Sequence, residues 1–460
     1  MSAKGLTHFP ELENKKEEKM FSHKKWTSLL ALVMIVSMVL SACATPTPKI
    51  VKETVVVEVT AEPAPTAAPT MAPTKDKIVF GGARPLSGPN AIYEQAAFGP
   101  IYKMWIDEVN AKGGIYVEEY GKRLPIAEPI IYDDTSDLGT MTRLVEKLIV
   151  EDKVDFLLPP ASTSFLFAAA PIFNKYGYIL LGAEGGATTI TEVLPTLPYF
   201  FGVLNYSDRY QIPVLADILE EVGAKSAAIM FLQDLHGIEY SGVAITELGN
   251  RGIDVPVVKS VPMDLQDASP ILKEAQAANV DALLLFCYPD QSFLAIGQAI
   301  ALGINFNAVL TGPGGNFTVF PASFGPAAEG VMGEGAWNCK SSPAAAEFCD
   351  KFLARYGSYE SMDWWGGLIY YGGLQFFEQA IEKAGTLDQA VIRDVMATEK
   401  FDTVLGPTWF DMFGDGGGLL AIECHPGEIG QWQNGVFEVI DPGDKRTAEP
   451  VYPKPAWPGP

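Results

Sequence analysis

The fold is decided by the stretch Val154-Asp155-Phe156-Leu157-Leu158-Pro159-Pro160-Ala161-Ser162-Thr163-Ser164. Its first five residues form an apolar run, which is typical of a strand buried on both faces of a parallel sheet. The two prolines end this strand, and a helical run at 165–175 follows the hydroxyl residues. A second strand, 178–181, then enters the small-residue loop 182–186. Open α/β sheets bind small molecules at such loops, where neighbouring strands have their carboxyl ends.

The hydroxyl residues 162–164 admit two interpretations. They can cap the helix that follows, because the first turn of a helix has amide groups without intrahelical partners. They can also hold an anionic group, because free amides and the helix dipole both favour negative charge there. The residues alone leave both interpretations open. The loop 182–186 adds that a ligand can approach the backbone closely, because three of its five residues are glycine.

The length and net charge of the chain limit its number of domains and its possible partners. A chain of 460 residues is long enough for two or three domains, each with a substantial core. The net charge is −23, and residues 1–42 hold six Lys and four Glu, so the chain from Cys43 onward carries −25. This acidity argues against nucleic acid as a partner and against charge-driven binding to an anionic membrane surface.

The five cysteines suggest an oxidising compartment. Cys339 and Cys349 bracket a short loop and can pair outside the cytoplasm, whereas the spacing of Cys287 and Cys424 does not tell whether they pair. Cys43 belongs to a different motif. The histidines that follow it lie far apart and outside any metal-ligand spacing, so no metal or cofactor is expected.

The N-terminus looks like a targeting segment. Lys24-Lys25 precede a mostly apolar run at 29–40, which is too short for a permanent membrane span. The run ends in Leu40-Ser41-Ala42-Cys43, which resembles the lipobox of bacterial lipoproteins. The resemblance implies that residues 1–42 are a signal peptide, that the Cys43 thiol is lipidated, and that the acyl chains anchor the protein. Because residues 1–19 are polar and long for a signal, translation is expected to begin at Met20.

The segment after Cys43 should be a tether. Residues 44–75 are rich in Pro, Thr and Ala, with too little apolar surface to fold alone. We therefore expect residues 43–76 to hold a folded domain away from the membrane.

Strands and helices alternate from Lys77 onward. A strand is expected at 78–80, followed by a turn-rich loop at 81–90. Further strands of the first unit are expected at 124–132, 154–158 and 178–181, with helices between them. The pattern restarts after 204, with strands at 227–231, 255–261, 282–286 and 308–310, again separated by helices. This alternation predicts two α/β units with parallel sheets and a ligand-binding cleft between them.

Helices trail the second unit. They are expected at 344–355, 366–383 and 387–398, and short β-like segments follow. The pairs Trp364-Trp365 and Tyr370-Tyr371 are expected to pack against these helices rather than to bind a ligand.

Several short motifs lie between Lys77 and Trp457, and the Ser/Thr loop after the third strand is one of them. The others are Pro85-Leu86-Ser87-Gly88-Pro89-Asn90, Asn110-Ala111-Lys112-Gly113-Gly114-Ile115, Tyr132-Asp133-Asp134, Thr403-Val404-Leu405-Gly406-Pro407 and Phe410-Asp411. Together and in register, these motifs resemble a known family, the extracytoplasmic leucine/isoleucine/valine-binding proteins of ABC importers. The closing segments 431–435 and 452–457 resemble the branch of this family that takes amino acids, amides and related acids.

The resemblance implies an α/β fold with two Rossmann-like lobes, each a parallel sheet flanked by helices. Three crossings near Gly202, Gly335 and Leu405 would form the hinge of this type I periplasmic-binding fold. Lobe 1 would comprise 77–203 and 336–404, lobe 2 would comprise 204–335 and 405–445, and 446–460 would be a C-terminal tail.

The resemblance also implies ligand contacts. Tyr93 corresponds to an aromatic residue that packs on the ligand, and Thr163, beside Ser162, to a hydroxyl that grips its carboxylate. Ala183 and Gly185 match positions whose backbone groups hold the carboxylate and the ammonium.

In the second lobe the match is less complete. His236 replaces a usual tyrosine, and Tyr288 matches another. The carboxylate that holds the ligand's ammonium would fall at Gly314, which has no side chain. Glu184 can take over this role, or the natural ligand has no ammonium. Gly185 likewise lacks a hydroxyl that many members carry.

The expected function is a monomeric substrate-binding lipoprotein outside the cytoplasm. It would close two lobes over an amino acid, amide or carboxylic acid and deliver this ligand to the permease and ATPase subunits of an importer. A ligand sensor with the same lobes is the alternative. An enzyme is not expected, because no nucleophile–base pair, metal set or phosphate loop has a recognisable spacing.

Overall fold

The computed structural model describes residues 74–183, 188–204, 207–424 and 427–458. All of them belong to the second of two compact units, Met71–Pro460. Predictions about the signal peptide, Cys43, Glu184 and Gly185 therefore lie outside the described residues. Within the described ranges no helix is both long enough and apolar enough to cross a bilayer.

The first lobe is built on two groups of strands. In one group β1 lies between β4 and β5, and all three are parallel. In the other group β6, β7 and β16 are parallel, and β15 pairs antiparallel with β16. The strands of this lobe are β1 (Phe80–Arg84), β4 (Ile130–Asp133), β5 (Phe156–Leu157), β6 (Leu180–Gly182), β7 (Phe200–Gly202), β15 (Phe410–Met412) and β16 (Gly418–Leu420), with the hairpins β2 (Ile115–Val117)–β3 (Lys122–Leu124) and β13 (Phe401–Thr403)–β14 (Gly406–Thr408).

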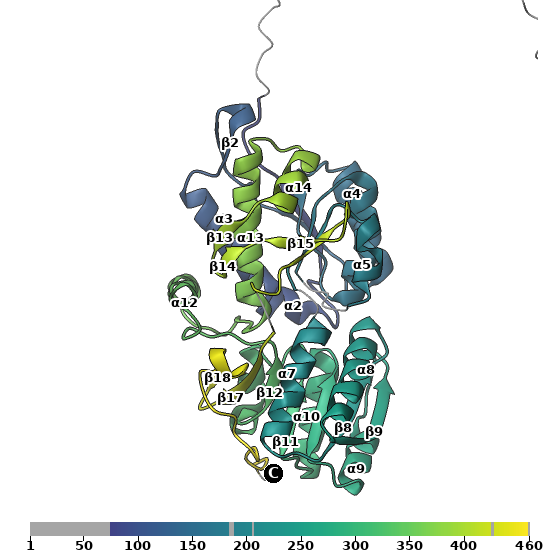
Figure 1. Ribbon diagram of the computed structural model, residues 1–460. Coiled ribbons are helices and arrows are strands. Elements are labelled where there is room, and N and C mark those ends of the chain that lie inside the picture. The colour runs from purple at the N-terminus through teal and green to yellow at the C-terminus, as the bar shows by residue number, and fades with distance from the viewer. Residues whose placement is uncertain (1–73, 184–187, 205–206, 425–426, 459–460) are drawn as a thin grey trace, which may run out of the picture. The chain divides into compact units, whose positions relative to one another are not determined.

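Helices cover both faces of these strands (Figure 1). On one face Leu148 of α4 and Phe173 of α5 are buried with Leu180 of β6. On the other face Trp105 of α3 and Phe377 of α13 are buried in a second cluster that includes Phe80. The helices of this lobe are α2 (Ala91–Ala96), α3 (Phe98–Ala111), α4 (Leu138–Val150), α5 (Thr163–Tyr176), α6 (Ile190–Val193), α12 (Pro343–Tyr356), α13 (Gly366–Ala384) and α14 (Gln389–Thr398).

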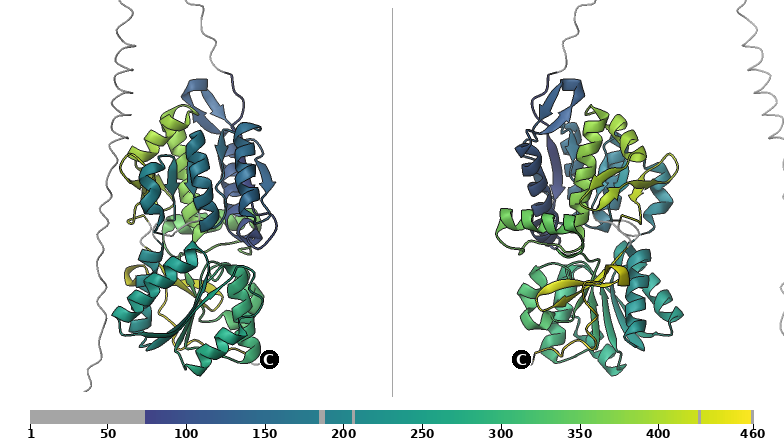
Figure 2. Two further views of the ribbon diagram at one scale, coloured as in Figure 1. Left: turned by 90° about the vertical axis from the view of Figure 1, so that its right-hand side faces the viewer. Right: turned by 60° about the vertical axis from the view of Figure 1, so that its left-hand side comes forward.

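The second lobe has one seven-stranded sheet of order β18-β17-β12-β11-β10-β8-β9. Strands β8 to β12 are parallel, and the C-terminal hairpin β17–β18 joins β12 antiparallel. Figure 2 shows this hairpin in yellow within the lobe. The elements are β8 (Ser226–Leu232), β9 (Asp254–Val261), β10 (Ala282–Phe286), β11 (Ala308–Thr311), β12 (Met332–Glu334), β17 (Ile429–Gln433), β18 (Val436–Asp441), α7 (Ser207–Glu221), α8 (Leu235–Asn250), α9 (Ser269–Ala277), α10 (Pro289–Leu302) and α11 (Val319–Phe324). The expected architecture of two α/β lobes is confirmed.

The first strand begins later than predicted. We expected 78–80 as strand and 81–90 as loop, but β1 spans Phe80–Arg84. A Cβ at Gly81 would lie 2.8 Å from Leu148 Cδ2 and 2.9 Å from a Val154 methyl carbon. The glycine therefore permits close packing inside the sheet, whereas the sequence suggested a turn.

The third crossing also differs from the prediction. We placed it near Leu405 and assigned 405–445 to the second lobe, but β15 and β16 pair with β7 of the first lobe. Leu419 of β16 fills the space beside Gly202, where a Cβ would lie only 2.6 Å from its Cδ2. The chain therefore crosses between β16 and β17, and the other two crossings lie between β7 and α7 and between β12 and α12.

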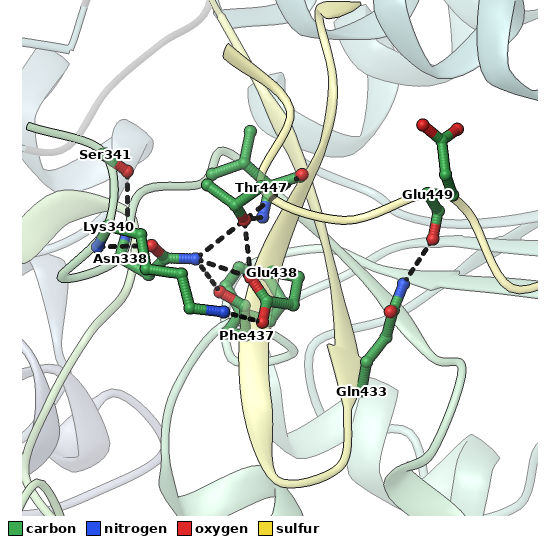
Figure 3. A network of polar contacts seen from close by, with 9 residues as sticks. Asn338, Lys340, Ser341, Gln433, Phe437, Glu438, Thr447 and Glu449 are labelled. Carbon is green, nitrogen blue, oxygen red and sulfur yellow. Dashed lines mark hydrogen bonds and ion pairs between the residues drawn. The ribbon is translucent and has the colours of Figure 1, made fainter.

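A polar network fastens the crossing after β12 to the second lobe (Figure 3). The Asn338 amide donates to the Phe437 carbonyl at 3.1 Å, to Glu438 Oε2 at 3.2 Å and to Thr447 Oγ1 at 3.0 Å. Lys340 forms an ion pair with the other oxygen of Glu438. These bonds hold the start of the crossing against β18.

The disulfide suggested by the sequence lies directly after this network. Cys339 and Cys349 are bonded, which ties the crossing to α12. Cys287 and Cys424 are both free thiols.

Candidate functional site

One pocket collects side chains from both lobes. It leaves about 400 Å³ free of protein atoms, including the part open to solvent. Seven of its thirteen lining residues carry an aromatic ring, and the lining also includes two hydroxyl residues and a carboxylate. The lining residues are Tyr93, Phe98, Ser162, Thr163, Leu204, His236, Tyr240, Tyr288, Pro313, Phe317, Asp363, Trp365 and Gly366.

The structure brings five of the expected ligand contacts together in this pocket, namely Tyr93, Ser162, Thr163, His236 and Tyr288. They come from four separate segments that are up to 195 positions apart in the chain. Their convergence is what a two-lobed binding site requires.

Two other expected contacts do not line the pocket. Ala183 is buried at the end of β6. Gly314 directly follows the lining residue Pro313 and has φ +106°, with an added Cβ only 2.8 Å from Pro289 Cγ. A side chain at 314 would therefore be both strained and crowded, which explains why this position offers no carboxylate.

The start of α5 forms the hydroxyl side of the pocket. Ser162 immediately precedes the helix with φ +81° and ψ 154°, and its side chain makes no capping hydrogen bond. A non-glycine residue with positive φ is uncommon and occurs more often at functional sites. Capping therefore does not apply to the Ser162 side chain. The start of α5 lines the pocket, and a helix N-terminus favours an anionic group there.

A buried ion pair supports this helix start. Arg84 Nε lies 2.9 Å from Glu94 Oε2, and both side chains are almost fully buried. The Arg84 guanidinium also donates to the Pro159 carbonyl, and the Tyr102 hydroxyl donates to Glu94 Oε1 at 2.5 Å. This network fixes the loop that leads into α5. The sequence did not predict it, because Arg84 fell in the expected turn-rich loop.

Aromatic rings from the two lobes meet across the pocket. The ring of Tyr93 packs edge-on against Tyr288 and Phe317, with centroid distances of 6.2 and 5.9 Å. The Tyr288 hydroxyl donates to Asp234 Oδ2 at 2.7 Å, and Asp234 also caps α8 by accepting from the Gly237 amide. The ring of Tyr288 is therefore held in place by a residue that is itself fixed to a helix.

His236 contributes a neutral imidazole. Burial lowers its pKa to about 4, and its Nε2 lies 4.0 Å from Glu334 Oε2. Burial also raises the pKa of Glu334 well above its usual range. Neither His236 Nε2 nor the two Glu334 oxygens have a hydrogen-bond partner in the described part of the chain. Near neutral pH, His236 therefore offers a hydrogen bond and a ring face, not a positive charge.

Asp363 and Trp365 are lining residues that the sequence prediction missed. The two tryptophans were assigned to helix packing, but Trp365 faces the pocket. Asp363 precedes α13, and its Oδ1 accepts from the Trp365 amide at 2.8 Å and from the Asn316 side chain. Burial raises the pKa of Asp363 to about 7. The only local signal was an acidic residue just before a helix, which usually indicates a cap.

Comparison with known proteins identifies the family of this chain. The family described as periplasmic binding protein matches residues 77–422. A leucine-, isoleucine-, valine-, threonine- and alanine-binding protein of Pseudomonas aeruginosa is 25% identical over 345 residues, which are 74% of this chain and 87% of that protein.

Solved structures share the fold. A branched-chain amino acid transporter substrate-binding protein of Streptococcus pneumoniae, in complex with isoleucine, has a TM-score of 0.66 at 20% identity and covers 80% of this chain and 100% of that chain. A solute-binding protein of an ABC transporter from Rhodopseudomonas palustris BisB5, in complex with 3,4-dihydroxybenzoic acid, has a TM-score of 0.64 at 20% identity, with coverages of 83% and 97%. The resemblance found in the sequence is thus confirmed, and the chain belongs to the periplasmic binding protein family.

Proposed function

We propose that this protein is the substrate-binding component of an ABC importer and that it captures an amino acid or a related carboxylate between its lobes. The observation that carries the proposal is the pocket, where the start of α5 faces aromatic rings from both lobes. The hydroxyls of Ser162 and Thr163 and the first amides of α5 bind the ligand's carboxylate. Tyr93, Tyr288 and His236 cover its less polar part.

Two observations bear on the ligand class. The Pseudomonas aeruginosa relative is named for five aliphatic or small amino acids. In contrast, one structural neighbour holds 3,4-dihydroxybenzoic acid, a carboxylate without an ammonium group. An acid of this kind is the second candidate, because the pocket is lined by aromatic rings and Gly314 has no carboxylate to bind an ammonium group.

Isothermal titration calorimetry of residues 74–460 tests the ligand class. The panel is leucine, isoleucine, phenylalanine, a short aliphatic amide and 3,4-dihydroxybenzoate. We expect micromolar or tighter binding of at least one compound with a carboxylate, and none of the amide. Heat from the amide alone, or from no compound, contradicts the proposal.

Delivery to a permease requires that the protein stay near the membrane. The family implies a location outside the cytoplasm. We propose that a lipid on Cys43 anchors the chain and that residues 44–75 act as its tether, which leaves the lobes free to reach the permease and ATPase complex as a monomer. The support is the lipobox-like Leu40-Ser41-Ala42-Cys43.

Fractionation of the native host tests the anchor. The wild-type protein should be in the membrane fraction, with a mature N-terminus at an acylated Cys43. The Cys43→Ala variant should lose the acyl mass, and a wild-type protein whose mass begins at Met1 or Met20 would refute cleavage. Genes for a permease and ATPases beside this gene favour import over the sensor alternative.

A further inference from the structure

Asp363 is a buried carboxylate that faces the candidate binding site. Its side chain lines the pocket, and the residue is 2% exposed. Its hydrogen-bond donors are all neutral, namely the Asn316 amide and the backbone N–H groups of Trp365 and Gly366. In the described part of the chain no Lys, Arg or His forms an ion pair with it. Burying a carboxylate without a cation is costly, and the amides at the start of α13 offset this cost only with partial charges.

The surroundings of Asp363 favour a cation. Among the described residues that line the pocket, none is Lys or Arg, and His236 is neutral near pH 7 because burial lowers its pKa to about 4. Trp365, Phe98 and Phe317 lie on the same pocket. Aromatic ring faces attract ammonium groups, most strongly where water is excluded. A carboxylate among aromatic rings therefore offers both components of a cation site.

Position 314 cannot supply a carboxylate for an ammonium group. Its φ of +106° and its closeness to Pro289 exclude an ordinary side chain. Asp363 comes from a different lobe and a different segment, the one that leads from α12 into α13.

We propose that Asp363 binds the ammonium group of an amino-acid ligand, while the start of α5 at Ser162 and Thr163 binds the carboxylate. This inference rests on the proposed function and sharpens it, because it selects amino acids over acids without an amine. A charge-assisted bond in a buried site should make at least a tenfold difference in affinity.

The test compares each amino acid with its deaminated counterpart. The probes are leucine against 4-methylpentanoate and phenylalanine against 3-phenylpropanoate, titrated by calorimetry at pH 8. The variant is Asp363→Asn, which keeps an oxygen for the Trp365 amide but removes the charge. The control is Asp134→Asn, another fully buried aspartate, whose Oδ1 accepts from the Ser136 amide and which does not line the pocket.

Whichever of leucine and phenylalanine binds more tightly, the wild-type protein and Asp134→Asn should bind it at least tenfold more tightly than its deaminated counterpart. In Asp363→Asn this preference should disappear, with the affinity for the deaminated acid unchanged or higher. If Asp363→Asn keeps the preference, the inference is wrong and the proposed function stands. If wild-type protein prefers the deaminated acids, the inference is wrong and the ligand is a simple carboxylate. If it binds none of the four probes, the inference is wrong, and the proposed ligand class fails with it unless isoleucine or 3,4-dihydroxybenzoate binds.

A second readout uses the unaltered protein and does not depend on a variant folding. Burial raises the pKa of Asp363 to about 7, so the free carboxyl is partly protonated at pH 6.5. An ammonium group must displace this proton, so leucine binding should release protons at pH 6.5 and 4-methylpentanoate binding should not. Among the described residues that line the pocket, the other titratable side chains are the phenols of Tyr93, Tyr240 and Tyr288 and the neutral His236. Calorimetry in buffers of different ionisation enthalpy measures the release, and its absence with leucine overturns the inference.

Discussion

The indole N–H of Trp364 donates a 3.0 Å hydrogen bond to the hydroxyl of Thr318. Trp364 precedes α13 of the first lobe, whereas Thr318 follows β11 of the second. Two backbone hydrogen bonds lie beside this contact, from the Thr318 amide to the Met362 carbonyl at 2.9 Å and from the Trp364 amide to the Asn316 carbonyl at 3.2 Å. This strip joins the lobes next to the pocket, so it should stabilise the ligand-bound arrangement.

Thr318→Val removes the side-chain bond and keeps the shape of the residue. A neutral hydrogen bond contributes about 1 kcal/mol net, so affinity should fall about fivefold. The loss should be the same for an amino acid and for its deaminated counterpart, because Thr318 does not line the pocket. Thr142→Val is the control, since the Thr142 hydroxyl donates to the Gly139 carbonyl within α4. Equal affinities of both variants in calorimetry would show that the bond does not stabilise the bound state.

Gly314→Asp should fail to supply the missing carboxylate. The new side chain would have to adopt φ near +106° and displace Pro289. We expect a loss of roughly 2 kcal/mol in unfolding free energy relative to Gly121→Asp, measured by urea denaturation. Gly121 is the matched control, because it has φ +63° but no atom within 4 Å of an added Cβ. A Gly314→Asp protein as stable as the control, with tighter amino-acid binding, would contradict this account of the pocket.

His236 should make the folded protein sensitive to acid. Burial lowers the pKa of His236 from 6.5 to about 4. Between pH 6.5 and pH 4 the imidazole is therefore protonated in the unfolded chain and neutral in the folded chain. The contribution of His236 to the unfolding free energy is therefore fully present above pH 6.5 and is lost as the pH falls toward 4.

The measurement compares wild-type protein with His236→Gln. Between pH 8 and pH 5 the wild-type unfolding free energy should drop by on the order of 2 kcal/mol more than that of the variant. Asp363 and Glu334 have raised pKa values and act in the opposite direction, but they are present in both proteins. Identical acid sensitivity of the two proteins would place His236 in contact with water.

The disulfide between Cys339 and Cys349 should stabilise the lobe that contains α12. It closes a loop with a sequence separation of ten residues. Chain entropy predicts that Cys339→Ser/Cys349→Ser loses about 2.5 kcal/mol of unfolding free energy. Cys424→Ser serves as the control because Cys424 is a free thiol. If reducing agent leaves the wild-type unfolding curve unchanged, the bond does not stabilise the native fold.

Much of the fold could be predicted because strand and helix periodicity is strong in both lobes. The helices α12, α13 and α14 lie within two residues of their expected bounds. The errors fall where glycine has a packing role. Gly81 was interpreted as a turn residue, and the pairing of β16 beside Gly202 was not foreseen. In both cases glycine leaves space for a side chain from a distant segment, and no local sequence pattern predicts this packing.

The site was predictable to the extent that its residues lie on the expected loops. Ser162 and Thr163 follow a buried strand, and Tyr93, His236 and Tyr288 were found through a resemblance in register. Asp363 was not predicted, because its place in the pocket depends on how the chain returns from the second lobe to the first. Arg84 was missed for the same reason, since its partners Glu94 and Pro159 meet it only in the folded lobe.

We propose that the start of α5 binds the anionic end of the ligand. Calorimetric titration of Ser162→Ala/Thr163→Ala with leucine, or with the compound of the panel that binds most tightly, measures this contact. Thr142→Ala in α4 is the control. We expect at least a tenfold loss of affinity for the double variant and none for the control. An unchanged affinity in the double variant would show that the start of α5 does not bind the ligand.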